Sequence, residues 1–401
     1  MAQVRTGRKP GGQAGHPGTT LERTTAPDRI VEHRPAVCDG CGATLGEHLP
    51  SQAVEARQVF DLPPHIALEA VEHRLHTLAC PDCGTATKAT APAGAARQAQ
   101  YGPNIEAAAV YLANQHFVPL KRAAQLLADL FGAVISPATI QKMTAKAAAA
   151  IQAAFRPAAR KLLLAAPAAH ADETGFNVNG QTMWAHSLSS PQAAWIQVHP
   201  KRGRAAIDAI GPIPAFAGTL VHDAWAPYDT YPRIGHHQLC CAHLLRELQA
   251  VADQHGHAGG QWCWAGQTHR ALTDLIHDPA RLEETRADIL SALACARGDP
   301  DPPGKLGRKH AALRRRIAQR LDDYLRFATT PGLPPTNNPA EQEIRMAKTK
   351  QKISGTMRTL DGANAFAAIR SYLSTARKHA VAPLDALASL TSPNPWLPTT
   401  P

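Results

Sequence analysis

The spacing of apolar residues along the chain changes twice, and the changes divide the sequence into regions. Residues 21–90 contain short β-like runs, such as HIALEAVEHRLHTLAC. From Tyr101 the spacing is that of amphipathic helices, which we expect at residues 105–115, 120–130 and 137–150. Gly132 is placed to end the second helix, and Ser136 followed by Pro137 is typical of the start of the third. Two helices joined by a short turn favour either a DNA-binding helix-turn-helix or an ordinary helical bundle.

After residue 165 the spacing becomes that of strands. The segments LAAPAAHADETGF, QTMWAHSLSS and QAAWIQVHP predict three strands, and Asn179-Gly180 predicts a two-residue hairpin between the first two. A helix over residues 203–210 and two further strands, AGTLVHD and HHQLCC, follow. The order β-β-β-α-β-β is typical of a ribonuclease H-like core. Residues 243–330 are mostly helical and interrupt this core, and helices return at residues 339–380.

These patterns predict a multidomain α/β protein. A ribonuclease H-like catalytic domain with a helical insertion is preceded by a zinc-binding domain and a helical, helix-turn-helix-like domain. The expected regions are a disordered basic arm at 1–20, the zinc-binding domain at 21–90, the helical domain at 101–160, the catalytic domain at 161–380 with its insertion at about 243–330, and a C-terminal tail at 381–401. The last ten residues are rich in Pro and Thr, and we expect them to be disordered.

The charge balance suits an anionic partner. The chain has 42 Lys and Arg against 32 Asp and Glu, a formal net charge of +10. This balance favours nucleic acid as partner, although a basic soluble enzyme fits equally well. No segment resembles a signal peptide or a membrane span, so the expected location is the cytoplasm.

Three acidic residues occupy positions that could meet at one site. Asp172 lies within the first predicted strand, Asp223 ends the fourth, and Glu341 opens a later helix that can pack across the sheet. Phosphodiester chemistry uses such a set to hold two Mg²⁺ ions, which require oxygen ligands. Glu173 and Glu343 are rival ligands, but the alternation of a strand and the turn of a helix direct them to other faces. His222 is expected to be a packing residue.

A structural alternative exists for Glu341. Asn338 as N-cap and Glu341 three residues later resemble a capping box, which would make the glutamate a stabiliser of the helix start.

Four of the eight cysteines form two CxxC pairs: Cys38, Cys41, Cys80 and Cys83. Four thiolates suit a tetrahedral structural zinc ion, although the gap between the pairs is longer than the usual spacing of about 15–20 residues. The alternative is a pair of reduced, unoccupied motifs. Cys240 and Cys241 fall on a predicted core strand and are expected to be buried thiols.

At these residues the chain resembles a known family. HADETG (170–175), LVHDAWAPY (220–228), LCCAHLLREL (239–248) and TNNPAEQEIRMAKTKQKISG (336–355) are similar to segments of transposases of the insertion sequence sixty-six family, of the DDE class. The similarity extends through AFAAIRSYLSTARKH (365–379) and also covers CDGCG, CPDCG and YGPNIEAAAVYL. The resemblance implies a ribonuclease H-like catalytic domain with Asp172, Asp223 and Glu341 as the acidic triad, catalytic Mg²⁺ or Mn²⁺, and structural Zn²⁺. It also implies transposon-end and target DNA as partners, a homo-oligomer on DNA, and accessory proteins of the same element.

Two basic runs are candidate phosphate contacts, the alternative being solvated helix faces. The residues that we expect to bind DNA are Arg314, Arg315, Arg316, Arg345, Lys348, Lys350 and Lys352. His243 and Glu247 share a helix face near Arg246, and their roles remain open between assisting catalysis and a structural ion pair.

The predicted function is metal-dependent cleavage at transposon ends and strand transfer into target DNA. Two alternatives remain: a ribonuclease H-like nuclease without joining activity, and an inactive or truncated transposase-derived, zinc-dependent DNA-binding protein.

Overall fold

The computed structural model describes residues 21–46, 48–50, 55–62, 66–92, 94–95, 97–254, 262–296, 302–392 and 394–399. The predicted basic arm at residues 1–20 lies outside this set. The chain divides into two compact units, Met1–Ile66 and Ala67–Pro401. All of the helices and strands named below belong to the second unit.

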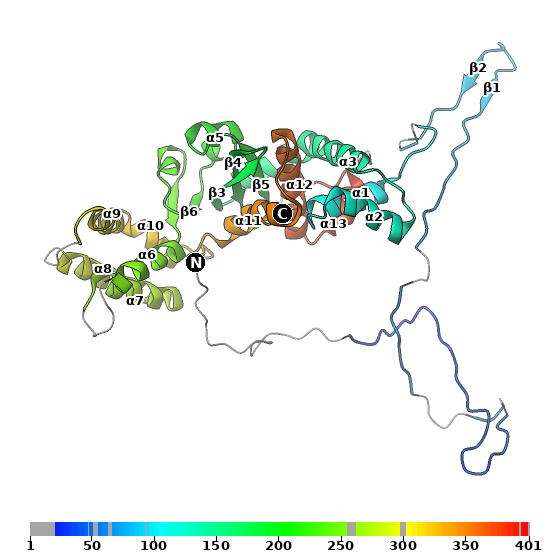
Figure 1. Ribbon diagram of the computed structural model, residues 1–401, viewed down its shortest axis with the longest axis horizontal. Helices are drawn as coiled ribbons and strands as arrows, with labels where there is room; N and C mark the ends of the chain where they lie inside the picture. Colours follow the sequence, from blue (N-terminus) through cyan, green and yellow to red (C-terminus); the bar gives the residue numbers. More distant parts are fainter. Residues whose placement is uncertain are drawn as a thin grey trace. The chain divides into compact units, whose positions relative to one another are not determined.

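A five-stranded sheet lies between two groups of helices (Figure 1). Its strands are β3 (Ala168–Val178), β4 (Gln181–Ser189), β5 (Ala194–His199), β6 (Thr219–His222) and β7 (His236–Leu239). Their order is β5-β4-β3-β6-β7, with β3, β4 and β5 antiparallel and with β6 and β7 parallel to β3. Helix α5 (Arg204–Ile210) separates β5 from β6, as expected. The mixed α/β class is therefore confirmed.

The predicted hairpin is present between β3 and β4. Asn179 and Gly180 have φ angles of 50° and 81°, which a type I′ turn requires at both central residues. This turn sets the register in which Asp172 pairs with Ser187 across the two strands.

The helices before the sheet follow the sequence pattern closely. They are α1 (Pro103–Asn114), α2 (Leu120–Phe131), α3 (Pro137–Ala150) and α4 (Arg156–Ala165), the last two joined by a π-helical turn, η1 (Ile151–Phe155). Gly132 caps α2 in the left-handed conformation, and the Ser136 hydroxyl accepts the Thr139 N–H at 3.1 Å. The local predictions for both ends are confirmed, while the DNA-binding role of these helices remains a prediction.

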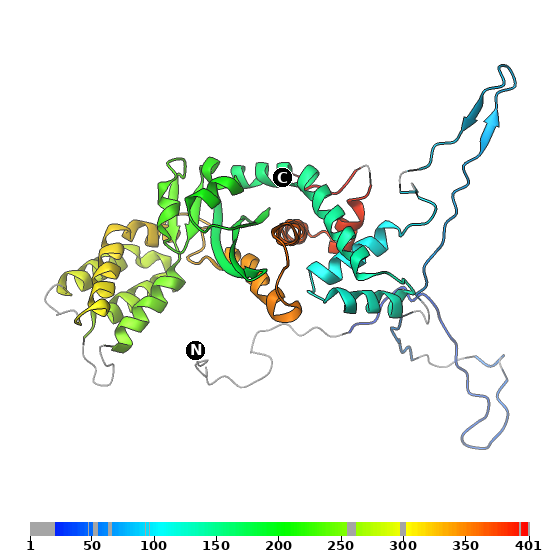
Figure 2. The ribbon, with the colours of Figure 1, turned by 45° about the horizontal axis from the view of Figure 1, so that its top comes forward.

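Helix α12 (Leu360–Lys378) covers the edge of the sheet at β5 and is seen nearly end-on in Figure 2. Three side chains of α12 accept backbone N–H groups of β5: Thr375 from Ala194, Ser371 from Ile196 and Asn364 from Val198, at 2.8–3.0 Å. An uncovered edge strand would expose these donors to pairing with other chains. The helix therefore closes this edge.

Helices α1 to α4 share one hydrophobic cluster with the sheet and with α12. Leu127, Phe155, Leu220 and Tyr372 belong to it, and each is buried. Helix α13 (Pro383–Ser389) packs on α1. The expectation of a disordered C-terminus is wrong for Trp396, because its ring packs on Tyr372 and its carbonyl accepts the Tyr372 hydroxyl at 3.1 Å. Aromatic packing of the partly buried Trp396 offsets the disordering tendency of Pro and Thr here.

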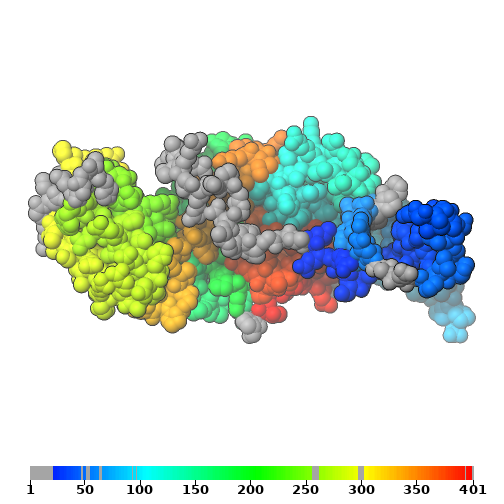
Figure 3. All heavy atoms as spheres, turned by 90° about the horizontal axis from the view of Figure 1, so that it is seen from below, coloured from blue at the N-terminus to red at the C-terminus, as the bar shows by residue number. Residues whose placement is uncertain are grey.

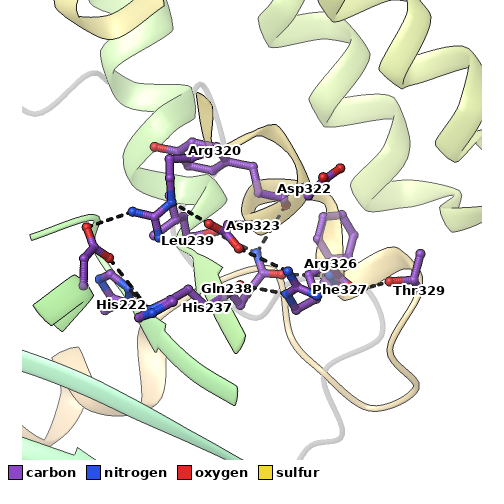
Figure 4. Close-up of polar contacts among 12 residues, drawn as sticks. His222, His237, Gln238, Leu239, Arg320, Asp322, Asp323, Arg326, Phe327 and Thr329 are labelled. Carbon is purple, nitrogen blue, oxygen red and sulfur yellow. Dashed lines mark hydrogen bonds and ion pairs between the residues drawn. The ribbon is translucent and has the colours of Figure 1, made fainter. Parts of the chain in front are cut away.

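The predicted helical insertion forms a rounded lobe, coloured yellow-green and yellow in Figure 3. It contains α6 (Cys241–Gln254), α7 (Trp264–His277), α8 (Leu282–Cys295), α9 (Lys305–Gln319) and α10 (Leu321–Leu325). Its core is a separate hydrophobic cluster that includes Trp264, Leu272 and Ile317. The Gln238 carboxamide of β7 accepts the Phe327 N–H, and Arg326 donates to the His237 carbonyl (Figure 4). These bonds fasten the insertion to the sheet.

Two strand predictions need correction. Strand β7 ends at Leu239, so Cys240 and Cys241 do not lie on a strand. Cys241 begins α6 and donates its N–H to the Pro335 carbonyl at 2.8 Å, a long-range bond that ends the ladder. Within the described part of the region 21–90, the β-like runs form strands only at β1 (Thr77–Ala79) and β2 (Ala86–Lys88). Among the described residues, no helix is both long and apolar enough to cross a membrane.

Candidate active site and cysteine turns

Asp172 lies within β3, and Asp223 directly follows β6, the neighbouring parallel strand. The β3–β6 ladder pairs His170 with Val221 at its last position. Each aspartate follows its paired residue by two positions, so the two carboxylates extend from one face of the sheet at adjacent places. The expected neighbourhood of the two aspartates is present, although β6 ends at His222 and Asp223 directly follows it.

The pKa of Asp172 is raised to about 8, mainly by burial and then by the nearby carboxylates of Glu173, Asp223 and Glu341. Three acids interacting in a partly buried site repel one another unless a cation neutralises them. The donor set, oxygen only, is the one that Mg²⁺ and Mn²⁺ prefer. The residues present therefore fit a hard divalent metal.

Glu341 enters this site from α11 (Asn338–Ser354), which packs on β3 and β4. Its Oε1 atom lies 3.6 Å from Nδ1 of His243 and 4.0 Å from Nη2 of Arg246, both on α6. The three carboxylates do not all approach within 4.8 Å of one another.

Asn337, which the sequence analysis did not single out, fixes the start of α11. It is fully buried, its Nδ2 donates to the Ala171 carbonyl at 2.8 Å, and its Oδ1 lies 3.3 Å from Nδ1 of His170. Its backbone N–H donates to Sγ of Cys240 at 3.2 Å. One residue therefore joins β3, the start of α6 and the helix that carries Glu341.

The capping-box alternative for Glu341 is wrong. The N-cap is Asn337, and Asn338 is already the first residue of the helix. The Asn337 side chain makes no cap bond to the helix because it is engaged by β3. The far end of α11 is also tied to β3, through the 2.8 Å bond from Gln351 to the Asn177 carbonyl. The helix thus lies along the strand that carries Asp172.

Both rival carboxylates are engaged by other protein groups. Glu173 is buried, accepts Arg202 at 2.7 Å and accepts the Tyr228 hydroxyl at 2.9 Å. Glu343 faces α12, where Ser374 donates to it and Lys378 lies 3.8 Å away. Their positions match the faces expected from strand alternation and helix rotation. His222 is fully buried, as a packing residue would be, and Glu247 forms an ion pair with Arg316.

The two CxxC pairs form the same local turn, one in each unit. In the first, Cys38 N–H donates to the Ala43 carbonyl and Gly42 N–H to the Cys38 carbonyl. In the second, Cys80 N–H donates to the Thr85 carbonyl and Gly84 N–H to the Cys80 carbonyl. Gly42 and Gly84 both have φ of 72°, a conformation that favours glycine. Tight turns of this kind present two thiolates together, as structural zinc requires.

The predicted DNA contacts differ in exposure. Arg315, Arg345, Lys348 and Lys352 are exposed. Lys350 is half-buried and donates to Ser354, and burial lowers its pKa. Arg314 lies over the Trp264 ring at 5.5 Å, and Arg316 pairs with Glu247, so both already contact the protein.

Two family models match the chain. Residues 98–365 match the model described as "Transposase IS66 family", and residues 35–84 match the "zinc-finger binding domain of transposase IS66". The first match covers more than half of the 401 residues and includes Asp172, Asp223 and Glu341. The second includes both CxxC pairs. A search of the curated proteins found no match.

Proposed function

Because the chain belongs to the IS66 transposase family, we propose that it is a DDE-class enzyme that cleaves transposon ends and joins them to target DNA in the bacterial nucleoid. Its catalytic core would be ribonuclease H-like, with Asp172, Asp223 and Glu341 as the metal ligands. The observation that carries the proposal is the convergence of these carboxylates from β3, β6 and α11. Their mutual repulsion contributes to the raised pKa of Asp172.

The reaction needs an activated attacking oxygen and a stabilised leaving oxygen. Mg²⁺ or Mn²⁺ held by Asp172, Asp223 and Glu341 would supply both as a Lewis acid. The protein's own contribution is to hold the ligands in place. The β3–β6 register sets Asp172 beside Asp223, and Asn337 with Gln351 sets α11 along β3.

DNA would be held through phosphate contacts beside this site. Arg345, Lys348 and Lys352 are exposed on α11, the helix that carries Glu341. Helices α1 to α3 are the candidate for end recognition, and the cysteine turns would bind structural Zn²⁺ in the matched zinc-finger region. A homo-oligomer on DNA and accessory proteins of the same element complete the proposed assembly.

The test is incubation of the full chain with a labelled transposon end, a target plasmid and Mg²⁺, followed by separation of the products. We expect end-cleavage products and strand-transfer joints, both absent with Asp223→Asn. Nicks without joints would favour the nuclease alternative. Binding of ends without any metal-dependent cleavage would overturn the proposal in favour of a DNA-binding protein.

A further inference from the structure

Three ligand atoms of a different chemical kind meet where α6 and α11 begin. They are Sγ of Cys240, Nδ1 of His243 and Oε1 of Glu341, and all lie within 4.8 Å of one another. Cys240 and His243 belong to the segment CCAH at the start of α6, and Glu341 comes from the first turns of α11. Sulfur and imidazole ligands do not suit Mg²⁺, but they suit Zn²⁺ and similar transition metals.

Two of these atoms are buried without a hydrogen-bond partner in the described part of the chain: Nδ1 of His243 and Oε1 of Glu341. Native proteins rarely leave buried polar atoms unsatisfied, because the loss of hydration costs about 1–3 kcal/mol each. The two atoms face each other at 3.6 Å, which is too long for a hydrogen bond. Two ligands on one tetrahedral zinc lie about 3.4 Å apart, given bonds of about 2.0–2.1 Å.

Cys240 supplies the third ligand atom of this group, its sulfur. Cys240 is 1% exposed, and its sulfur accepts the backbone N–H of Asn337 at 3.2 Å. The backbone N–H groups of Ala242 and His243 also favour its thiolate, although burial keeps the pKa of the thiol raised in the absence of a cation. A bound divalent cation would deprotonate the thiol outright.

Arg246 and Asp172 are the other charged groups that face Glu341. Nη2 of Arg246 lies 4.0 Å from Oε1 of Glu341, but the arginine side chain is 65% exposed, so it can move into solvent. Asp172 interacts with Glu341 through its negative charge, which favours a cation nearby. The electrostatics therefore do not oppose metal binding.

A second group of ligand-type atoms offers a contrast. His222, Asp229 and His237 also lie within 4.8 Å of one another, at the junction with the insertion shown in Figure 4. There, Nε2 of His222 is already bonded to Nδ1 of His237 at 3.0 Å, and Asp229 accepts Arg320 at 2.8 Å. Those contacts account for the proximity without a metal.

We propose that Cys240, His243 and Glu341 form a binding site for a zinc-class divalent cation at the edge of the catalytic centre. The fourth position is left for water or a phosphate oxygen. The site would join α6 to α11 and hold the carboxylate of Glu341. The inference rests on the proposed function only in that Glu341 is shared with the acidic triad.

The experiment measures metal stoichiometry in the full chain, without DNA. Metal-free protein is titrated with Zn²⁺ and with Co²⁺, whose absorption reports tetrahedral geometry and thiolate ligation. We expect Cys240→Ser and His243→Gln each to bind one equivalent less than the unsubstituted chain, whatever the CxxC pairs bind. Cys241→Ser is the matched control, since its sulfur faces the Tyr324 carbonyl at 3.4 Å and its loss should leave the stoichiometry unchanged.

Equal stoichiometry in Cys240→Ser and the unsubstituted chain would overturn the proposal, as would an equal loss in Cys241→Ser. If Cys240→Ser does not fold, His243→Gln decides the same question. Asp172→Asn separates this site from the proposed function. This variant should not cleave DNA, but it should still bind the full number of zinc equivalents. The cleavage assay therefore tests the proposed function, and the zinc titration tests the site at Cys240.

Discussion

The side-chain amide of Asn337 donates a hydrogen bond of 2.8 Å to the backbone carbonyl of Ala171. Ala171 immediately precedes Asp172 on β3, and Asn337 occupies the N-cap position of the helix that carries Glu341. The backbone carbonyl of Asn337 also accepts the Glu341 N–H at 3.2 Å. One buried amide thus sets the placement of one candidate metal ligand relative to another.

Asn337→Ala is expected to destabilise the protein by about 1–3 kcal/mol, because it leaves the Ala171 carbonyl and the His170 ring without their partner. As a positioning residue, Asn337 should also affect metal use. We expect a higher Mg²⁺ concentration for half-maximal cleavage, measured on the folded fraction. Asn338→Ala is the control, since Asn338 is exposed one residue later. A purely structural role would lower stability and leave the Mg²⁺ midpoint unchanged.

The raised pKa of Asp172 predicts a pH dependence of stability in chelator. Its folded pKa of about 8 lies above the ordinary pKa of 3.8, so protonation favours the folded state. The stabilisation is complete below about pH 4 and is lost as pH rises through 8. Between pH 5 and pH 8, the free energy of unfolding measured with urea should fall less for Asp172→Asn than for the unsubstituted chain. An identical fall in the free energy of unfolding of both proteins would contradict the raised pKa of Asp172.

The exposed cations of α11 should set the salt dependence of DNA binding. Replacing Arg345, Lys348 and Lys352 with Gln should reduce the slope of log K against log salt by about 0.9 for each phosphate that the variant no longer neutralises. Arg316→Gln is the control, because Arg316 already pairs with Glu247. Titrations by fluorescence anisotropy at several salt concentrations measure the slope. An unchanged slope in the triple variant would show that this face of α11 does not bind phosphate.

Zinc in the region of the cysteine turns should be structural. Elemental analysis is expected to give one zinc equivalent less per chain in Cys38→Ser, because the tetrahedral set then lacks one thiolate. Proteolysis within residues 35–84 should then become faster. Cys295→Ser, at an exposed cysteine outside the matched zinc-finger region, serves as the control. Full retention of zinc in Cys38→Ser would contradict the expectation.

Local signals along the chain predicted much of the fold. The Ser136 cap, the Gly132 stop and the Asn179-Gly180 hairpin depend on neighbouring residues alone, and the structure has all three. The alternation of β3 was sufficient to separate Asp172 from Glu173. Such features are encoded within a few residues and can be predicted without knowledge of the tertiary fold.

Features that depend on distant partners could not be predicted in this way. The segment HHQLCC continues the strand pattern, yet Cys241 begins a helix, and the distant Pro335 carbonyl accepts its N–H. Asn338 resembles an N-cap in sequence, but Asn337 is the N-cap, and its side chain donates a hydrogen bond to Ala171 of β3. The proximity of Cys240 to Glu341 likewise follows from the packing of α6 and α11, about 100 residues apart.

The central claim is that Glu341 completes a metal-binding triad with Asp172 and Asp223, and Glu343 provides a matched comparison on the same helix. Glu343 faces Ser374 and Lys378 on α12, so Glu343→Gln should remain folded and active. The decisive measurement is Mg²⁺-dependent cleavage of a labelled transposon end by each variant, with end binding and melting temperature recorded. We predict that Glu341→Gln lowers cleavage by about 100-fold or more while still binding the end. Robust cleavage by a folded Glu341→Gln protein, or loss of cleavage only in Glu343→Gln, would contradict the account.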